Sequence, residues 1–329
     1  MLAILLSYQG FAQVGGQTSF EFLNVSANAR LAGLGGVNVS LADRDVNFFF
    51  SNPALVSDSL AGRASAGYQF YIADIGQATF AYVHKFRKIG TVSFGVQHIS
   101  YGEITGYDAS GMEIGSFRSG ETALVISRSH QVSNFRVGAN LKAVFSTIAG
   151  FRSSALMFDL GGTFIHPTKN LTVGLAFKNL GFVFSEYSGT SDTKVPFDVQ
   201  VGATFKPEHM PLRFSLTAYN LATAGSAYDN PNDGDDDPGS FDKLIRHINI
   251  GTEILLHRNV NVLLAYNFLR QQELKTQNSG GSGFSVGAAL KIKAFDIVLS
   301  RSNYSVGNGA YSFTVAVNIQ NMILKKRSI

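Results

Sequence analysis

The stretch "NFRVGANLKAVFS", Asn134 to Ser146, decides which fold the chain adopts. Every second position carries an apolar side chain: Phe135, Val137, Ala139, Leu141, Ala143 and Phe145. The positions between them are mostly polar or glycine: Arg136, Gly138, Asn140, Lys142, Val144 and Ser146. Because successive side chains of a strand point to opposite faces, the stretch predicts a strand with one oily and one polar face.

The same alternation recurs from about Gly62 to the end of the sequence. It predicts fourteen strands, near residues 63–72, 76–86, 90–100, 121–131, 134–146, 154–165, 170–179, 196–206, 211–220, 244–256, 259–270, 282–292, 294–303 and 310–321. Strands of soluble proteins average about five or six residues, whereas a tilted strand needs about nine to eleven to cross a bilayer. Most of the predicted strands are long enough to cross.

The connections between these strands alternate in length. Every second connection is a tight turn, and those between them include long polar loops near 101–120, 180–195, 221–243 and 271–281. Outer-membrane barrels have short periplasmic turns and longer extracellular loops. The sequence therefore predicts an all-β fold, a transmembrane antiparallel β-barrel, with its loops at the cell surface of a bacterial outer membrane and both termini in the periplasm.

Composition distinguishes this barrel from a soluble β-sandwich. The chain is 45% hydrophobic and only 15% charged, against roughly 25% charged residues in soluble domains. A sandwich would cover the apolar faces with a second sheet, but its solvated outer faces should then carry abundant charge. A closed barrel leaves no unpaired backbone in lipid. Without a run of about 18 apolar residues, no transmembrane helix is expected.

The N-terminal part differs from the rest. Residues 1–12 are interpreted as a signal peptide or its remnant, residues 13–61 as a plug, residues 62–321 as the barrel and residues 322–329 as a periplasmic tail. Fourteen strands enclose more space than the roughly eight whose side chains fill the bore. The apolar segment 13–61 lacks sustained alternation and suits that space, although a soluble periplasmic arm is the alternative.

Two details of the plug are expected from the sequence. A short helix should span "SANARLAGL", Ser26 to Leu34, and end at Gly35-Gly36. The plug backbone should meet polar groups of the lumen, for which the candidates are Arg136, Lys142, Asp198, Glu253 and Lys291.

Little in the sequence points to an enzyme. There is no cysteine, so thiolate chemistry and disulfides are excluded, and a net charge of +4 is too small to indicate nucleic acid. Gly283 to Gly287 matches G-x-S-x-G, but its serine lies on a predicted strand rather than a strand-to-helix turn. No catalytic residue and no certain cofactor are predicted.

One acidic loop is a candidate cation site. In "YDNPNDGDDDPGSFD", Tyr228 to Asp242, carboxylates at close spacing could bind calcium; the candidate ligands are Asp229, Asp233, Asp235 and Asp237. The EF-hand template fails at Pro231 and Ser240. The alternative is a solvated loop extended by charge repulsion.

Three segments resemble known proteins. "ADRDVNFFFSNPALV", Ala42 to Val56, with its Asn52-Pro53-Ala54, resembles the plug-to-barrel junction of FadL-type long-chain fatty acid transporters. "TSFEFLNVSANARLAGLGGVNVSLAD", Thr18 to Asp43, resembles the start of PorQ-type components of the type IX secretion system of Bacteroidetes. "AFKNLGF", Ala176 to Phe182, is similar to a recurrent element of these barrels, including the related PorV.

The resemblance implies a fourteen-stranded barrel with an N-terminal plug, and two functions. One is a protein-secretion scaffold and membrane anchor: its extracellular loops would hold a PorZ-type surface protein, beside PorU and PorV, for attachment of cargo to lipopolysaccharide. The other is a FadL-like transporter of hydrophobic small molecules across the outer membrane. A structural or general diffusion porin is a third possibility. Short, polar loops favour the scaffold.

Overall fold

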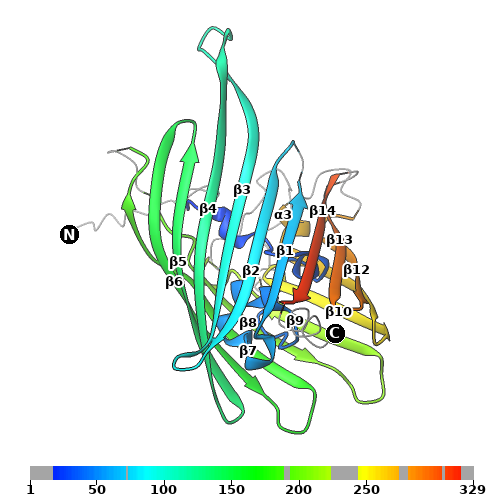
Figure 1. Ribbon diagram of the computed structural model, residues 1–329. Helices are drawn as coiled ribbons and strands as arrows, with labels where there is room; N and C mark the ends of the chain where they lie inside the picture. Colours follow the sequence, from blue (N-terminus) through cyan, green and yellow to red (C-terminus); the bar gives the residue numbers. More distant parts are fainter. Residues whose placement is uncertain are drawn as a thin grey trace, which may run out of the picture.

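Fourteen antiparallel strands form a closed barrel (Figure 1). The computed structural model describes residues 18–71, 73–188, 193–223, 244–273, 281–305 and 308–319. The interpreted signal peptide, the tail 322–329 and the candidate calcium ligands Asp229, Asp233, Asp235 and Asp237 lie outside these residues. The strands are β1 Arg63–Phe70, β2 Gly76–Phe86, β3 Gly90–Tyr107, β4 Glu113–Val132, β5 Phe135–Ile148, β6 Phe151–Ile165, β7 Leu171–Ser185, β8 Asp198–Phe205, β9 Leu212–Ala218, β10 Ile248–His257, β11 Val260–Asn267, β12 Phe284–Ile292, β13 Phe295–Ser305 and β14 Asn308–Asn318.

Pairing of the first and last strands closes the barrel. β1 pairs with β14 from Arg63 opposite Asn318 to Phe70 opposite Tyr311, and every other strand pairs with its sequence neighbours. The backbone groups of the paired stretches are therefore satisfied within the wall, as lipid requires. This confirms the predicted fold and the number of strands.

The outer surface of the wall is apolar, as β5 illustrates. Phe135, Val137 and Leu141 are each at least half exposed, whereas Asn140 and Lys142 on the other face are only 1–2% exposed. The oily face of the opening sequence stretch thus points outward and its polar face points into the bore. Among the described residues, no helix has the length and hydropathy to span a membrane.

Residues 18–60 fold into short helical segments inside the ring of strands, drawn in blue in Figure 1. These are η1 Glu21–Asn24, α1 Ala29–Gly33, η2 Val46–Phe50, η3 Pro53–Leu55 and η4 Asp58–Leu60. The Asn28 side chain caps α1 by accepting a hydrogen bond from the Leu31 N–H (2.7 Å), and Gly35 and Gly36 beyond its end have positive φ of 88° and 92°. The helix predicted over Ser26 to Leu34 is confirmed in a shorter form, Ala29–Gly33.

The plug meets the wall partly through an apolar cluster. The plug aromatic side chains Phe20, Phe22, Phe49 and Phe50 are buried. They belong to one cluster with inward-facing wall side chains, among them Val83, Val125, Val144 and Met157. The sequence predicted polar contacts between the plug and the lumen and missed this apolar cluster. A few apolar residues on the mostly polar inner face of the strands do not indicate which plug residues they contact.

Three parts of the wall differ from expectation. β7 continues to Ser185, into the segment 180–195 that was expected to be a loop. The segment 101–120 is not a polar loop: β3 and β4 continue to a turn at 108–112 and form a hairpin that rises above its neighbours (Figure 1). Beyond the membrane neither face of a strand meets lipid, so the alternation that identifies strands is lost there. The predicted strand 259–270 ends at Asn267, where the helix α3, Phe268–Glu273, begins.

Candidate functional site

The plug lies close against the wall at a row of glycines, called here the glycine window: Gly138 of β5, Gly161 of β6, Gly174 of β7 and Gly202 of β8. A Cβ at Gly138 would come within 2.5 Å of the Pro53 carbonyl carbon, and one at Gly161 would collide with the Asn52 side chain. Gly138 and Gly161 are opposite each other, as are Gly174 and Gly202. The window lets the plug backbone lie directly on the wall.

Asn52 links three pieces of chain at this window. Its Nδ2 donates to the Val39 carbonyl of the plug (2.8 Å) and to the wall carbonyls of Gly162 and Leu175 (both 3.3 Å). Its Oδ1 accepts from the Ala54 N–H (2.9 Å) and so caps η3. Pro53 is the first residue of that turn. Proline suits this position because the first N–H group of a helix has no partner within the helix. Asn52, Pro53 and Ala54 thus lie between plug and wall.

The "AFKNLGF" element contains a bulge in β7. Lys178 and Asn179 both point inward, because the register shifts between Phe158 and Leu160 of β6 and Asn179 adopts a positive φ of 57°. Asn179 Oδ1 accepts a hydrogen bond from Lys142 Nζ (2.7 Å), and its Nδ2 donates to the Pro196 carbonyl (2.9 Å). The bulge therefore fixes the inner face of the wall where β8 is about to begin.

A ring of four charges joins plug to wall. Arg30 of α1 contacts Glu253 of β10 (2.8 Å) and Asp43 of the plug (2.7 Å), and Arg213 of β9 contacts the same Glu253 (2.6 Å) and Asp43 (2.8 Å). We call these residues the charge ring. Glu253 is 2% exposed and Arg30 8%. Removing one partner of such a buried set typically costs about 3–5 kcal/mol.

The plug carboxylate of this ring stays ionised over a wide pH range. Burial alone would raise the pKa of Asp43, but the adjacent charges and hydrogen bonds of Arg30 and Arg213 hold that pKa well below its usual range. The plug is therefore tied to the wall by charges that persist in mild acid.

The five lumen groups predicted to meet the plug have three different outcomes. Arg136 donates to the Ala54 carbonyl (3.4 Å), and Glu253 contacts Arg30. Lys142 instead pairs with Asp159 inside the wall (2.8 Å), and Asp198 accepts from the Leu221 N–H (3.1 Å). Lys291 lines a cavity described below. The sequence could not say which inward charge would find which partner.

A cavity of about 570 Å³ lies at the end of the bore where the long loops emerge, and we call it the upper cavity. Its lining includes apolar side chains, among them Leu23, Leu31, Phe50, Phe197 and Leu269. It also includes Lys178, 7% exposed and without an ion pair among the described residues, and Arg270, which stacks on Tyr304 at 4.6 Å. The upper cavity is thus amphipathic.

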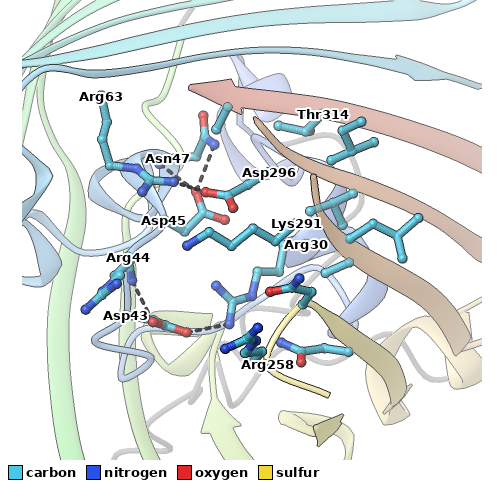
Figure 2. Close-up of a pocket in the computed structure, with 17 residues that line it drawn as sticks. Arg30, Asp43, Arg44, Asp45, Asn47, Arg63, Arg258, Lys291, Asp296 and Thr314 are labelled. Carbon is cyan, nitrogen blue, oxygen red and sulfur yellow. Dashed lines mark hydrogen bonds and ion pairs between the residues drawn. The ribbon is translucent and has the colours of Figure 1, made fainter. Parts of the chain in front are cut away.

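Two further cavities open between plug and wall at the short-turn end. The smaller, about 170 Å³, is shown in Figure 2, where Lys291 extends into its middle and Arg30 contacts Asp43. Arg63 pairs there with Asp296. The larger, about 450 Å³, is lined by the turn between β6 and β7 and by Arg136. Asp43 and Arg44 line both.

Neither the G-x-S-x-G match nor a metal cluster forms a reactive site in the described residues. Ser285 is fully buried on β12, and its hydroxyl donates to that of Ser302 (3.1 Å). No three metal-binding side chains gather in the part of the chain that the structure describes, which does not include the acidic loop.

Comparisons with known proteins identify the fold. No protein-family profile matches the chain, and no curated protein sequence matches it. Two solved variants of the TodX monoaromatic hydrocarbon channel match with a TM-score of 0.51 and 11% sequence identity. The deltaS2S3 variant covers 89% of this chain and 98% of its own, and the deltaS2 variant 88% and 97%. The chain is therefore similar to a channel barrel over nearly its whole length, and at that identity the similarity establishes the fold alone.

Fold and surface together identify a transmembrane β-barrel of the outer-membrane class. The wall is closed, its outer belt is apolar, and its bore contains a plug.

Proposed function

We propose that the protein is a plugged, FadL-like outer-membrane channel that passes small hydrophobic molecules. The upper cavity is the observation that carries this proposal. Its volume of about 570 Å³ falls within the roughly 300–1,000 Å³ of small-molecule sites, which are mostly apolar with a few placed polar groups. Leu23, Leu31 and Leu269 supply the apolar part, and Lys178 and Arg270 the polar part.

The wall beside the upper cavity supports a sideways exit into lipid. Among the described residues, no strand pairs with the β8-facing edge of β7 above Asn179, because the β7–β8 ladder ends at Lys178 opposite Asp198. Phe197 lies next to this edge, lines the upper cavity and is 37% exposed. A hydrophobic molecule leaving past Phe197 would not have to displace the plug from the glycine window and the charge ring.

The similarity to a monoaromatic hydrocarbon channel supports the proposal without naming the molecule carried. A small amphipathic cavity excludes large hydrophilic solutes, so general diffusion is disfavoured. The substrate class follows from the lining of the upper cavity and remains part of the proposal.

The experiment measures uptake of radiolabelled toluene, and of a labelled long-chain fatty acid, by intact cells with and without the protein. We expect uptake above the empty-vector level, and Phe197→Asp should lower it several-fold because a charge at the exit must be desolvated. Phe135→Asp, at the far end of β5, is the matched control and should leave uptake unchanged. Uptake equal to that of empty-vector cells contradicts the proposal.

A disulfide tests which way the molecule leaves. The chain has no cysteine, and the hydroxyls of Ser40 in the plug and Thr204 in the wall are 2.8 Å apart, so Ser40→Cys/Thr204→Cys should crosslink plug to wall. With a sideways exit, oxidised and reduced protein should transport equally. Loss of uptake on oxidation, restored by reductant, would mean instead that the plug moves.

A surface scaffold of the PorQ type is the second candidate, and the β3–β4 hairpin is the observation that favours it. Tyr107, Met112 and Ile114 near its tip are 63–70% exposed, although the hairpin continues beyond the barrel rim. Its partners would be a PorZ-type surface protein, with PorU and PorV beside it, acting on cargo bound for lipopolysaccharide. Loops at the surface and termini in the periplasm are part of this proposal.

Affinity purification from detergent-solubilised membranes separates the two functions. If the protein is a scaffold, a large surface protein should co-purify with it, and exchanging Tyr107, Met112 and Ile114 for Ser should abolish recovery without changing uptake. Bound hydrophobic molecules and no partner protein would favour the channel.

Calcium binding by Asp229, Asp233, Asp235 and Asp237 remains a separate proposal. Calcium should protect the loop 224–243 from protease at micromolar to millimolar levels, and the quadruple Asn variant should remove that protection. Equal cleavage with and without calcium would contradict it.

A further inference from the structure

The larger cavity at the short-turn end is strongly basic, and we call it the basic cavity. Its charged lining consists of Arg44, Arg136, Lys169, Lys206 and Arg213, with Asp43 as the one carboxylate among the lining residues. Asp43 already contacts Arg30 and Arg213. It therefore leaves the other cations of the cavity uncompensated.

Arg136 is the clearest sign that a charge is missing. It is 7% exposed, yet among the described residues its guanidinium donates only to neutral acceptors: Gln131 Oε1 (2.8 Å) and the carbonyls of Ala54 (3.4 Å) and Leu55 (3.5 Å). The nearby carboxylate of Asp58 is engaged by Lys85 (2.6 Å). Buried guanidinium groups are normally paired with an anion, and Arg136 faces the basic cavity without one.

The other cations approach from both sides of the cavity. Arg44 comes from the plug, Lys169 from the β6–β7 turn and Lys206 from just beyond β8. Among the described residues none of the three makes an ion pair. Cations that converge on a confined space raise the local concentration of anions.

Neutral donors complete the lining. Ser57, Ser59 and Thr172 also line the cavity, and the hydroxyls of Ser57 and Ser59 hydrogen-bond to each other (2.7 Å). His166 Nδ1 accepts hydrogen bonds from the backbone N–H groups of Thr168 (3.2 Å) and Lys169 (3.0 Å), so the proton of the neutral ring is on Nε2, which can donate. The lining is therefore rich in hydrogen-bond donors, as a site for an oxyanion requires.

We propose that the basic cavity binds a phosphate-bearing anion, held by Arg136, Lys169 and Lys206 on the wall side and by Arg44 on the plug side. Arginine forks and lysine ammonium groups are the side chains that recognise phosphate. At about 450 Å³ the cavity can hold a pyrophosphate or a glycerophosphate headgroup. The anion can come from a soluble phosphate compound or from an anionic lipid, and bound there it would bridge plug and wall.

Calorimetry with pyrophosphate tests the site, using full-length protein in a non-ionic detergent. We expect saturable binding that weakens with salt, and Lys169→Gln/Lys206→Gln should weaken it at least about tenfold, since the variant removes two charge-assisted hydrogen bonds to the anion. Both lysines lie at or beyond strand ends, so this variant should fold. Lys88→Gln/Lys293→Gln, which removes the same charge from other short turns, should bind within about twofold of wild type.

Two results would overturn the proposal: no binding heat with pyrophosphate, or equal weakening in the two double variants. Native mass spectrometry distinguishes the source of the anion. A lipid headgroup is identified if the wild-type protein retains phosphatidylglycerol and pyrophosphate displaces it. The Lys169→Gln/Lys206→Gln variant should then lose the lipid, and the control variant should keep it. Pyrophosphate binding without retained lipid identifies a soluble ligand. The result does not depend on whether hydrophobic molecules pass through the upper cavity.

Discussion

At the scale of single residues, the plug is positioned by wall glycines, whose lack of a side chain lets the plug backbone approach the wall. Gly138 lies on the polar face of the opening sequence stretch, where Pro53 comes so close that a Cβ would meet its carbonyl carbon at 2.5 Å. Gly162, one strand away on β6, has nothing within 4 Å of the equivalent position. The two glycines differ only in which face of the wall they occupy.

Gly138→Val should therefore expel Pro53 from the wall while leaving the barrel closed. We expect the band of the folded barrel in heat-dependent gel mobility, with a plug that added protease cleaves. Gly162→Val is the control and should keep the plug protected, because its side chain extends into open space. Equal protection of the plug in both variants would show that the glycine window does not hold it.

Glu253→Gln tests the charge ring. It leaves two arginines sharing Asp43, and the loss of one buried partner should destabilise plug docking by about 3–5 kcal/mol. Trypsin cleavage after Arg44 in detergent-solubilised protein would measure the change. Glu208→Gln makes the same exchange on an exposed turn and should be without effect; cleavage as slow in Glu253→Gln as in this control would contradict the proposed role of the ring.

At the scale of elements, the plug is one unit whose attachment should resist acid. Because the pKa of Asp43 is lowered below its ordinary value of 3.8, its contribution to stability is complete above about pH 4 and is lost only as pH falls through the lowered pKa. Plug protection against protease should be the same at about pH 8 and about pH 5. Faster cleavage at the lower pH would mean that another group controls docking.

The β3–β4 hairpin and the bulge of β7 show how elements depart from the regular pattern. Each strand alternates cleanly where lipid lies on one side and the bore on the other. The hairpin extends beyond lipid, and the bulge sends Lys178 and Asn179 to the same face. In both places the period of two fails for a structural reason, so neither was evident from alternation alone.

At the scale of the whole molecule, the apolar belt makes the cost of a charge depend on depth. Leu141 lies midway along β5, and Phe135 at its first residue. Leu141→Arg should reduce the stability of the barrel folded into lipid vesicles by about 2–4 kcal/mol, whereas Phe135→Arg should cost no more than about 1 kcal/mol. Denaturant titration in vesicles measures both, and equal costs would contradict the placement of β5 across the bilayer.

The closed barrel, its fourteen strands and the short helix of the plug were all predictable from the amino-acid sequence. Those features follow from local rules: alternation reports lipid on one side, and a capping residue and two glycines delimit a helix. A resemblance to a secretion component suggested a scaffold, whereas the upper cavity and the similarity of fold favour a channel.

Which groups meet in the bore depends on how the plug folds back inside the barrel. Arg30 and Glu253 are separated by 223 residues, and Asp43 and Arg213 by 170, so no spacing in the sequence relates them. The glycine window and the basic cavity likewise combine neighbouring strands with a plug folded back inside them. Local alternation specifies that a side chain points into the bore. The path of the plug specifies which groups that side chain contacts.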